Sequence, residues 1–352
     1  MQPTRLLSII APIIVFIVPA ALAQPHVIGI SGTLAQDETL IIIGSGFGSK
    51  SPAAPVLVDR LTQYSNLADG DLIPTSISGC PQCPWLRVGP QDDSVRFSTD
   101  SPRTAGGAAY RATAGGYLSH RDLDDAAPDR LLVNWWVRTS EDLDSSIPDR
   151  LIRVRTRFDD MTSAVTLSHG WLSVIMDFDQ GGSPEYLHGD WGVSPGAWYN
   201  LELQIDSNDI ESGRGKVTVR ADGSVIHHAG NCWAEAPLND IVILGFHLPD
   251  PDPDTTLVVD WTDIYIDTTF ARVLISDSPN AQAGSRSELQ IPVSWTSNEI
   301  VVQTTPGSFS ADETVYLFVI DEEGTWSQGG YEMTVGGGAE VPGMPGQPMR
   351  EM

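Results

Sequence analysis

Two neighbouring segments decide how this chain is organised: Val27-Ile28-Gly29-Ile30-Ser31-Gly32-Thr33 and, after a polar turn, Thr39-Leu40-Ile41-Ile42-Ile43-Gly44-Ser45-Gly46-Phe47-Gly48. This pattern predicts two strands joined by a turn, followed by a glycine-rich exit. Two strands alone do not make a stable domain, and no nearby segment completes a sheet. Strands of the missing kind occur only near the other end, at residues 299–303, 314–320 and 330–335. The sequence therefore predicts a small domain built from both ends of the chain, with a larger domain inserted between them.

The two ends together resemble the IPT/TIG domain, an immunoglobulin-like β-sandwich. The first half of its pattern, an isoleucine shortly before S-G, a turn and T-x-x-I-x-G-x-G-F-G, is matched by Ile28, Ser31, Gly32, Thr39, Ile42, Gly44, Gly46, Phe47 and Gly48. The second half is matched by Ile300-Val301-Val302, Pro306-Gly307, Val315–Val319 and Gly324-Thr325-Trp326-Ser327. The resemblance implies a discontinuous domain over residues 24–58 and 276–336. A continuous domain within the first hundred residues is the alternative.

The first 23 residues have the pattern of a secretory signal peptide. Arg5 precedes an apolar stretch, and Ala21-Leu22-Ala23 supplies small residues for cleavage before Gln24. A membrane anchor is the competing interpretation, but the apolar run is short and contains Pro12. We therefore expect a secreted protein, extracellular or periplasmic after cleavage, without membrane insertion.

Charge and cysteine content narrow the function classes. The 352 residues carry 46 acidic and 20 basic side chains, for a formal net charge of −26. Such acidity disfavours binding to nucleic acid or to anionic lipid, so we expect no nucleic-acid partner. The three cysteines are Cys80, Cys83 and Cys232. In an oxidising compartment we expect one disulfide, joining Cys232 to Cys80 or to Cys83.

The inserted segment, residues 59–275, is a series of short alternating strands separated by Gly, Pro, Asp and Asn turns. In one strand, Leu131, Val133, Trp135 and Val137 predict a buried face opposite Asn134, Trp136 and Arg138. Many such strands predict an antiparallel sandwich. The predicted fold class is therefore all-β. In the strand at residues 258–267 the apolar positions change phase, which predicts a bulge near Thr262-Asp263.

Three motifs of the inserted segment, Pro195–Leu203, Gly215–Gly223 and Val258–Asp267, together resemble the concanavalin A-like jelly roll. Laminin-G-like lectin domains, several polysaccharide lyases and some glycosidases share that sandwich, so the resemblance implies the fold and not an activity. The arrangement as a whole also resembles a set of secreted bacterial proteins. Residues 337–352 are glycine- and proline-rich, and we expect a disordered tail.

The strongest candidate for function is a row of arginines, Arg153, Arg155 and Arg157, at alternate positions of one predicted strand. Alternate positions project to one face, and guanidinium groups pair well with carboxylate or sulfate. Trp136 and Arg138 could lie on the same face. The resemblance implies that extended sugars bind the concave face of the jelly roll. We therefore predict a non-catalytic protein that recognises an extended, acidic polysaccharide or cell-surface glycan. Neutralisation of the row by neighbouring carboxylates is the competing interpretation.

Two other functions remain open. A polysaccharide lyase would need a base beside a group that neutralises a uronate, and His169, Tyr186 and His188 lie near turns. No pair of acids has the glycosidase spacing E-x-D-x-x-E. The third hypothesis is a structural surface protein. We expect no cofactor, although a structural calcium at the loop with Asp250, Asp252 and Asp254 would be an alternative to a solvated acidic loop.

Overall fold

The computed structural model describes most of the chain between residues 24 and 339. The described ranges are 24–75, 83–89, 94–100, 102–113, 116–120, 129–140, 150–158, 161–168, 173–177, 185–187, 194–206, 215–232, 241–247, 257–280, 282–284 and 286–339. The expected signal peptide and residues 340–352 of the expected tail lie outside these ranges. The predicted fold class, an all-β chain with one sandwich inserted into another, is confirmed.

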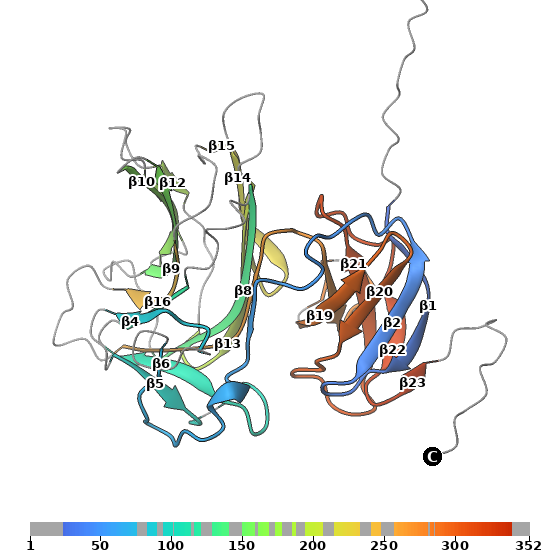
Figure 1. The fold of residues 1–352 in the computed structure, drawn as a ribbon, viewed down its shortest axis with the longest axis horizontal. Coiled ribbons are helices and arrows are strands. Elements are labelled where there is room, and N and C mark those ends of the chain that lie inside the picture. Colours follow the sequence, from blue (N-terminus) through green and yellow to red (C-terminus); the bar gives the residue numbers. More distant parts are fainter. Residues whose placement is uncertain are drawn as a thin grey trace, which may run out of the picture.

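Both ends of the chain contribute to one sandwich, which we call the terminal domain (Figure 1). In spatial order its strands are β22 (Tyr331–Thr334), β21 (Thr314–Ile320), β18 (Arg272–Ser276), β19 (Ser287–Trp295), β20 (Glu299–Gln303), β2 (Thr39–Ser45), β1 (His26–Thr33) and β23 (Gly338–Ala339). Leu40 pairs with Val302, and Ile42 pairs with Ile300. All four side chains are fully buried in one core. The first two strands thus find their partner near the other end of the chain.

The glycine-rich exit from β2 is required by packing. A Cβ on Gly44 would lie 2.1 Å from the carbonyl oxygen of His26 and 2.3 Å from the ring of Phe47. Phe47 is fully buried in the core of the terminal domain. Only glycine lets the chain turn inward at this close approach.

The central domain consists of two packed sheets. The seven-stranded sheet contains β12 (Glu185–Leu187), β11 (Ser173–Asp177), β10 (Met161–Ser168), β9 (Arg150–Phe158), β16 (Ile241–His247), β7 (Tyr117–His120) and β4 (Arg87–Gly89). The eight-stranded sheet contains β15 (Ser224–Cys232), β14 (Gly215–Ala221), β13 (Trp198–Asp206), β8 (Arg130–Thr139), β17 (Val258–Asp267), β6 (Ala109–Thr113) and β5 (Val95–Ser98), with β3 (Leu57–Asp59) paired to β17. A short 3-10 helix, η1 (Thr62–Tyr64), follows β3.

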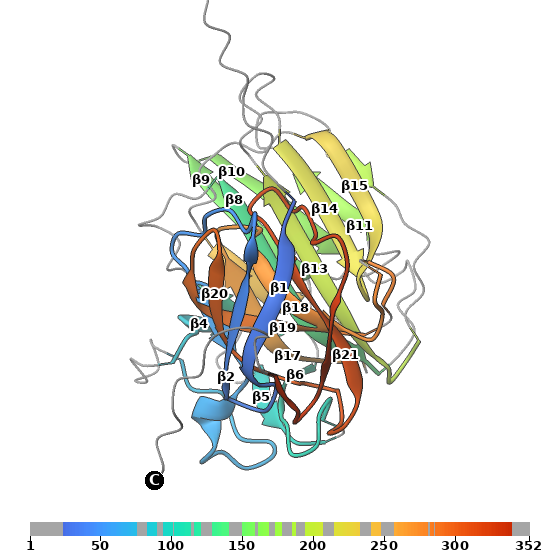
Figure 2. The same ribbon diagram turned by 90° about the vertical axis from the view of Figure 1, so that its right-hand side faces the viewer.

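Strand β8 is covered on both of its faces. Leu131, Val133, Trp135 and Val137 pack in the core between the two sheets, as the alternation predicts. The opposite face is also buried: Leu132 is fully covered, and Trp136 is 8% exposed. Figure 1 shows the reason, because the eight-stranded sheet lies between the seven-stranded sheet and the terminal domain. Viewed from the terminal side in Figure 2, β14 and β15 extend beyond the terminal domain.

The domain boundaries differ from those predicted. Residues 57–58 were assigned to the terminal domain and residues up to 275 to the inserted one, but β3 pairs with β17 and β18 pairs with β19 and β21. The central domain therefore extends from Leu57 to Asp267. The physical reason is that Val273 and Ile275 pack in the terminal core. The expected disordered tail from residue 337 is also shortened, because β23 pairs with β1.

The predicted bulge in β17 is confirmed. The register between β17 and β8 shifts between Thr262 and Tyr265, and Asp263 has a φ of 50°. A bulge leaves residues out of the ladder and turns a side chain away from its regular direction. Here it directs the carboxylate of Asp263 to a partner across the space between the domains, as described below. Among the described residues, none forms a helix long and apolar enough to cross a membrane.

Candidate functional site

The predicted binding residues do not share one face, and this part of the sequence interpretation is wrong. Trp136 and Arg138 lie on β8 of the eight-stranded sheet, whereas Arg153, Arg155 and Arg157 lie on β9 of the seven-stranded sheet. Strand β9 is paired on both sides, with β10 and β16. The side chains of the three arginines lie outside the described part of the structure. Alternation in sequence fixes the face of each strand, but not which of two sheets the strand joins.

Arg138 forms an ion pair and is not available on an open surface. Its Nη2 lies 2.5 Å from Oδ2 of Asp260, and its guanidinium lies 5.1 Å from the centre of the Trp198 ring. Asp260 also accepts a hydrogen bond of 2.7 Å from Nε of Arg111. The strands explain this cluster, since Asp260 is directly opposite Arg138 on one neighbouring strand and Arg111 on the other. Cross-strand pairs of opposite charge stabilise a sheet.

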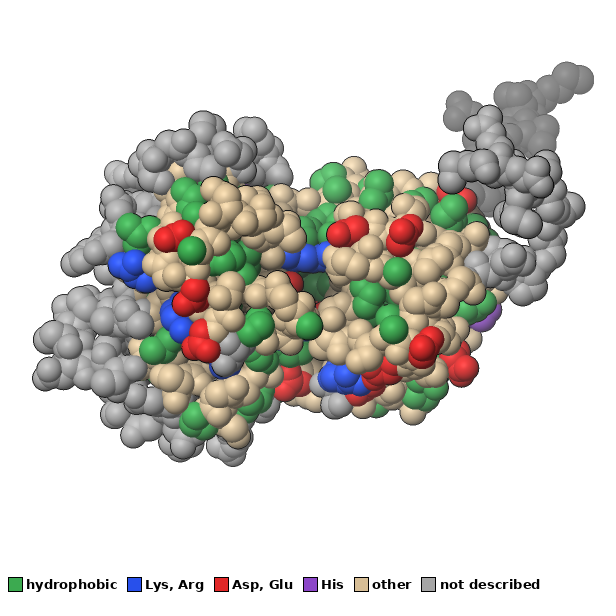
Figure 3. Space-filling model, turned by 90° about the horizontal axis from the view of Figure 1, so that it is seen from below, with side chains coloured by type: hydrophobic (Ala, Val, Ile, Leu, Met, Phe, Trp, Pro, Cys, Tyr) green, Lys and Arg blue, Asp and Glu red, His purple; other side chains and the backbone are tan. Residues whose placement is uncertain are grey.

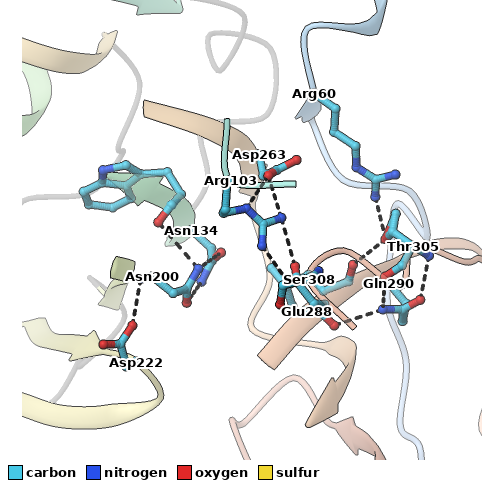
Figure 4. Close-up of polar contacts among 12 residues, drawn as sticks. Arg60, Arg103, Asn134, Asn200, Asp222, Asp263, Glu288, Gln290, Thr305 and Ser308 are labelled. Carbon is cyan, nitrogen blue, oxygen red and sulfur yellow. Dashed lines mark hydrogen bonds and ion pairs between the residues drawn. The ribbon is translucent and has the colours of Figure 1, made fainter. Parts of the chain in front are cut away.

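Trp136 lies under an arginine that the sequence did not indicate. The guanidinium carbon of Arg103 is 4.4 Å from the ring centre of Trp136, a cation–π contact. The same guanidinium donates from Nε to Asp263 at 2.7 Å and from Nη1 to Glu288 at 2.5 Å. Asp263 belongs to β17, and Glu288 belongs to β19 of the terminal domain. Figure 4 shows Arg103 between Asp263 of the central domain and Glu288 of the terminal domain, so Arg103 joins the two domains.

The terminal domain holds Glu288 in position for this contact. Its Oε1 accepts hydrogen bonds from the backbone N–H of Ser308 at 2.9 Å and from the hydroxyl of Ser308 at 2.8 Å. Gly307 has a φ of +61°, and a Cβ there would lie 2.2 Å from Cδ of Glu288. The absence of a side chain at residue 307 thus leaves room for the carboxylate.

A cavity of about 520 Å³ lies around these residues, between the two domains. It is lined by Arg60, Phe97, Arg103, Asn134, Trp136, Asp263, Tyr265, Glu288 and Thr305, by Thr62, Ser65 and Thr262, and by the loop at residues 104–108. We call it the interdomain cavity. Figure 3 shows a hollow between the two halves of the molecule, with basic and acidic side chains inside it. Cavities at domain interfaces of about this size are where proteins usually bind small molecules.

Arg60 differs from Arg103 in its partners. Its Nη2 donates to the hydroxyl of Thr305 at 2.7 Å, and no described carboxylate lies within ion-pair distance of it. Burial lowers the pKa of Arg60, and the more distant charges of Asp263, Asp37 and Glu288 oppose this shift. A guanidinium so placed remains charged. Arg60 therefore offers N–H donors and a positive charge to an occupant of the interdomain cavity.

The titratable side chains of the cavity are engaged in hydrogen bonds with their neighbours. Tyr265 donates its hydroxyl proton to Asp267 at 2.7 Å, and burial raises its pKa well above the usual value. Asp263 and Glu288 both accept hydrogen bonds from Arg103. The acidic and phenolic groups of the cavity are therefore all hydrogen-bonded to neighbouring side chains.

A buried ion pair links the two segments at which the chain crosses between the domains, one after β2 and one after β17. Nζ of Lys50 lies 2.6 Å from Oδ2 of Asp267, and both side chains are fully buried. Lys50 follows the exit of β2, and Asp267 ends β17. Lys50 also donates to the hydroxyl of Thr269 at 3.2 Å. Burial lowers the pKa of Lys50 and raises the pKa of Asp267, and each charge opposes the shift of the other.

Several predictions about metals and cysteines fall largely outside the described residues. Asp250, Asp252 and Asp254 lie there, as do His169 and His188 and the side chain of Tyr186. Within the described residues, no three His, Cys, Asp or Glu side chains gather as a metal site. Cys83 is disulfide-bonded. The structural calcium remains a prediction, and so does the pairing of Cys232.

Sequence reasoning did not select Lys50, Arg60, Arg103 or Glu288. One signal was available, because Lys50 is one of only two lysines in the chain and directly follows a glycine-rich exit. Arg103 and Glu288 stand 185 positions apart, and neither belongs to a motif. Their proximity arises only from the docking of one domain on the other, which local sequence patterns do not describe.

Comparison of the sequence with family models and with curated proteins gives no match. Among solved structures, an endo-β-1,4-glucuronan lyase from the fungus Trichoderma reesei is similar over 62% of this chain and 97% of its own, with 15% identity and a TM-score of 0.41. An alginate lyase from Aplysia kurodai is similar over 61% of this chain and 99% of its own, with 11% identity and a TM-score of 0.42. The receptor-binding domain of botulinum neurotoxin D covers 66% and 68%, with 11% identity and a TM-score of 0.37. At these identities and TM-scores the likenesses carry no inference about activity.

Proposed function

We propose that this protein is a secreted, non-catalytic binding protein for an acidic polysaccharide, and that the interdomain cavity receives a carboxylate-bearing sugar. The observation that carries the proposal is the contrast between two arginines of one cavity. Arg103 is held by Asp263 and Glu288, whereas the side chain of Arg60 donates, among the described residues, only to the hydroxyl of Thr305. A planar guanidinium without an acidic partner matches a carboxylate.

The remaining lining supports a sugar as the group that carries this carboxylate. Hydroxyl and amide side chains surround the cavity, including Asn134, Thr62, Ser65 and Thr104. Such groups can both donate and accept hydrogen bonds, as sugar hydroxyls require. The apolar rings of Phe97 and Trp136 cover part of the same wall. A volume of about 520 Å³ is enough for a small ligand or for one unit of a longer chain.

The arginine row of β9 is the second part of the proposal. Arg153, Arg155 and Arg157 lie in the other sheet of the central domain, so they would bind a separate stretch of an extended ligand. Two distant contacts with one polymer strengthen binding through effective concentration.

The test measures binding of uronate oligosaccharides from alginate, pectin and glycosaminoglycans by calorimetry, with neutral oligosaccharides for comparison. We expect acidic oligosaccharides to bind, with an affinity that falls as salt is added. Arg60→Gln should weaken binding about 10-fold, because it removes one charge-assisted pair. Arg96→Gln is the matched control: this arginine is exposed on the same domain and donates to the carbonyl of Gly70, so binding should stay unchanged.

Three results would contradict parts of the proposal. The Arg153→Ala/Arg155→Ala/Arg157→Ala variant could lose binding while Arg60→Gln keeps the wild-type affinity. That result would place the ligand on the seven-stranded sheet alone. A rise in ultraviolet absorbance during incubation with uronate polymers would show unsaturated products, and hence a lyase. Self-association without affinity for any glycan of the panel would favour a structural protein.

A further inference from the structure

A second, smaller cavity lies between the domains, on the other side of Asn134, which lines both cavities. Its volume is about 20 Å³, and its walls are Asn134, Asn200, Glu202, Arg220, Gly223, Arg272, Leu274, Ser287, Leu289 and Trp326. Glu202 and Arg220 come from β13 and β14 of the central domain, and Arg272 begins β18 of the terminal domain. We call it the small cavity. A space of this size holds one water-sized particle.

The charges around the small cavity do not balance. Oε1 of Glu202 lies 2.9 Å from Nη2 of Arg272 and 3.3 Å from Nε of Arg220. One carboxylate therefore faces two guanidinium groups. The side chain of Arg272 is 1% exposed and that of Arg220 is 13% exposed, so little solvent reaches either of them. Buried charges in proteins are normally compensated, and here one positive charge remains without a described counterpart.

Within the described part of the chain, the hydrogen bonding around the small cavity is also incomplete, and an acceptor is missing. Four buried N–H groups of the lining have no hydrogen-bond partner among the described residues: Nε and Nη1 of Arg220, Nε of Arg272 and Nε1 of Trp326. Every one of these atoms is a donor. Most buried polar groups in native proteins have a partner. The small cavity thus lacks an acceptor, and it lacks a negative charge.

We propose that the small cavity binds a single halide ion, chloride under ordinary conditions. A halide supplies one negative charge and accepts hydrogen bonds from all sides. It would therefore balance the excess positive charge and pair with the N–H donors that have no described partner. A water molecule accepts at most two hydrogen bonds and brings no charge. A volume of about 20 Å³ leaves no room for sulfate or for a carboxylate ligand. The bound ion would link Arg220 of the central domain to Arg272 and Trp326 of the terminal domain.

This inference is independent of the proposed glycan binding. Among the described residues, the small cavity and the interdomain cavity share only Asn134 and Leu289 in their linings, and Arg60 does not line the small one. A halide at the small cavity would stabilise the docking of the domains by mass action, because it binds the docked state alone. Stability should therefore depend on the identity of the anion at constant ionic strength.

The test compares thermal unfolding of the full chain in sodium chloride with unfolding in sodium gluconate at equal ionic strength. We expect the midpoint to be several degrees higher in chloride and to rise with chloride concentration. Crystals grown in bromide should show an anomalous peak within hydrogen-bond distance of Arg272 Nε and Trp326 Nε1. Equal midpoints in the two salts, or a water molecule alone in the cavity, would overturn the proposal.

Two variants assign the effect to this cavity. Trp326→Phe removes one donor but keeps an aromatic ring against Phe318, which now packs 5.5 Å from Trp326 between ring centres. It should weaken the apparent chloride affinity about 5-fold. Arg220→Met removes the excess charge, and its midpoint should be the same in both salts. Arg96→Gln should keep the full chloride response. An unchanged response in Trp326→Phe and Arg220→Met would show that chloride acts elsewhere.

Discussion

The two faces of the eight-stranded sheet contact very different surroundings. The inner face packs on the seven-stranded sheet through apolar side chains such as Trp135, Leu203 and Val219, all almost completely buried. The outer face meets the terminal domain through a small apolar cluster around Leu132 and through charged and amide groups, among them Arg103 and Glu202. The interdomain cavity and the small cavity both lie on this outer side. Adjacent residues of one strand, Trp135 and Trp136, thus belong to two chemically distinct layers.

The difference separates what makes the fold from what orients the domains. Burial of apolar surface has no direction and stabilises any close packing. Ion pairs such as Arg103–Glu288 have defined geometry but contribute little net stability once desolvation is counted. We infer that the inner layer holds the central domain together, and that the outer layer fixes how the terminal domain docks. Four measurements test this division of roles.

The largest effect is expected from truncation of the inner layer. Leu203→Ala should lower the free energy of unfolding by about 4 kcal/mol, because a fully buried core leucine leaves a cavity. Leu132→Ala is the matched variant, since Leu132 is also fully buried but packs in a small cluster with Tyr265 and Phe270. It should cost about 2 kcal/mol. Equal losses in urea unfolding would contradict the division into two layers.

The next largest effect should come from the ion pair at the domain crossings. Lys50→Met leaves the carboxylate of Asp267 buried without its counter-charge, at a cost of about 3 kcal/mol. The double variant Lys50→Met/Asp267→Asn removes both charges and keeps an acceptor for Tyr265. It should recover most of the loss. A double variant as unstable as the single one would mean that the geometry of this contact, and not the buried charge, stabilises the connection between the domains.

Gly307→Ala probes the support of Glu288. The new Cβ would lie 2.2 Å from Cδ of Glu288, at a positive φ that disfavours a side chain. We expect a loss of about 2 kcal/mol in stability. Gly324→Ala provides the control, because Gly324 also has a positive φ but has open space around it. If both variants lose the same amount, the contact with Glu288 contributes nothing and only backbone strain remains.

The smallest effect is a pH dependence within the central core. Burial raises the pKa of Tyr64 from 10.0 to about 12. Between these values the unfolded chain loses its proton while the folded one keeps it, so stability falls as pH rises from about 10 to about 12. Tyr64→Phe should show a fall about 1 kcal/mol smaller than the wild type over this range. Parallel curves for the two proteins would contradict the raised pKa.

Local pattern predicted the layers of single strands but not their assembly. The alternation around Trp135 identified the inner face of β8, and the phase change in β17 located the bulge at Asp263. Both features arise from the twofold period of a strand, which is visible in sequence. The assignment of β8 and β9 to different sheets depends on long-range pairing, so Trp136 was wrongly grouped with Arg153.

The candidate site was the least predictable part. Its residues Arg60, Arg103 and Glu288 come from loops and strands of two domains. Each one alone has the pattern of a solvated surface charge. Their role follows from docking, which buries the outer face of β8, and an antiparallel sheet is commonly solvated on one side. Nothing in the period of β8 distinguishes the two situations.

The pairing of β2 with β20 has a consequence for how this protein assembles. Ile43 lies opposite Glu299, more than 250 residues later in the chain, and closing so long a loop from a random coil costs about 5 kcal/mol of entropy. A central domain that folds first pairs Leu57 with Ile266, so its two ends lie next to each other. The distant closure then becomes a local one. We infer that the central domain folds first and that the terminal domain, which needs both ends of the chain, is completed last.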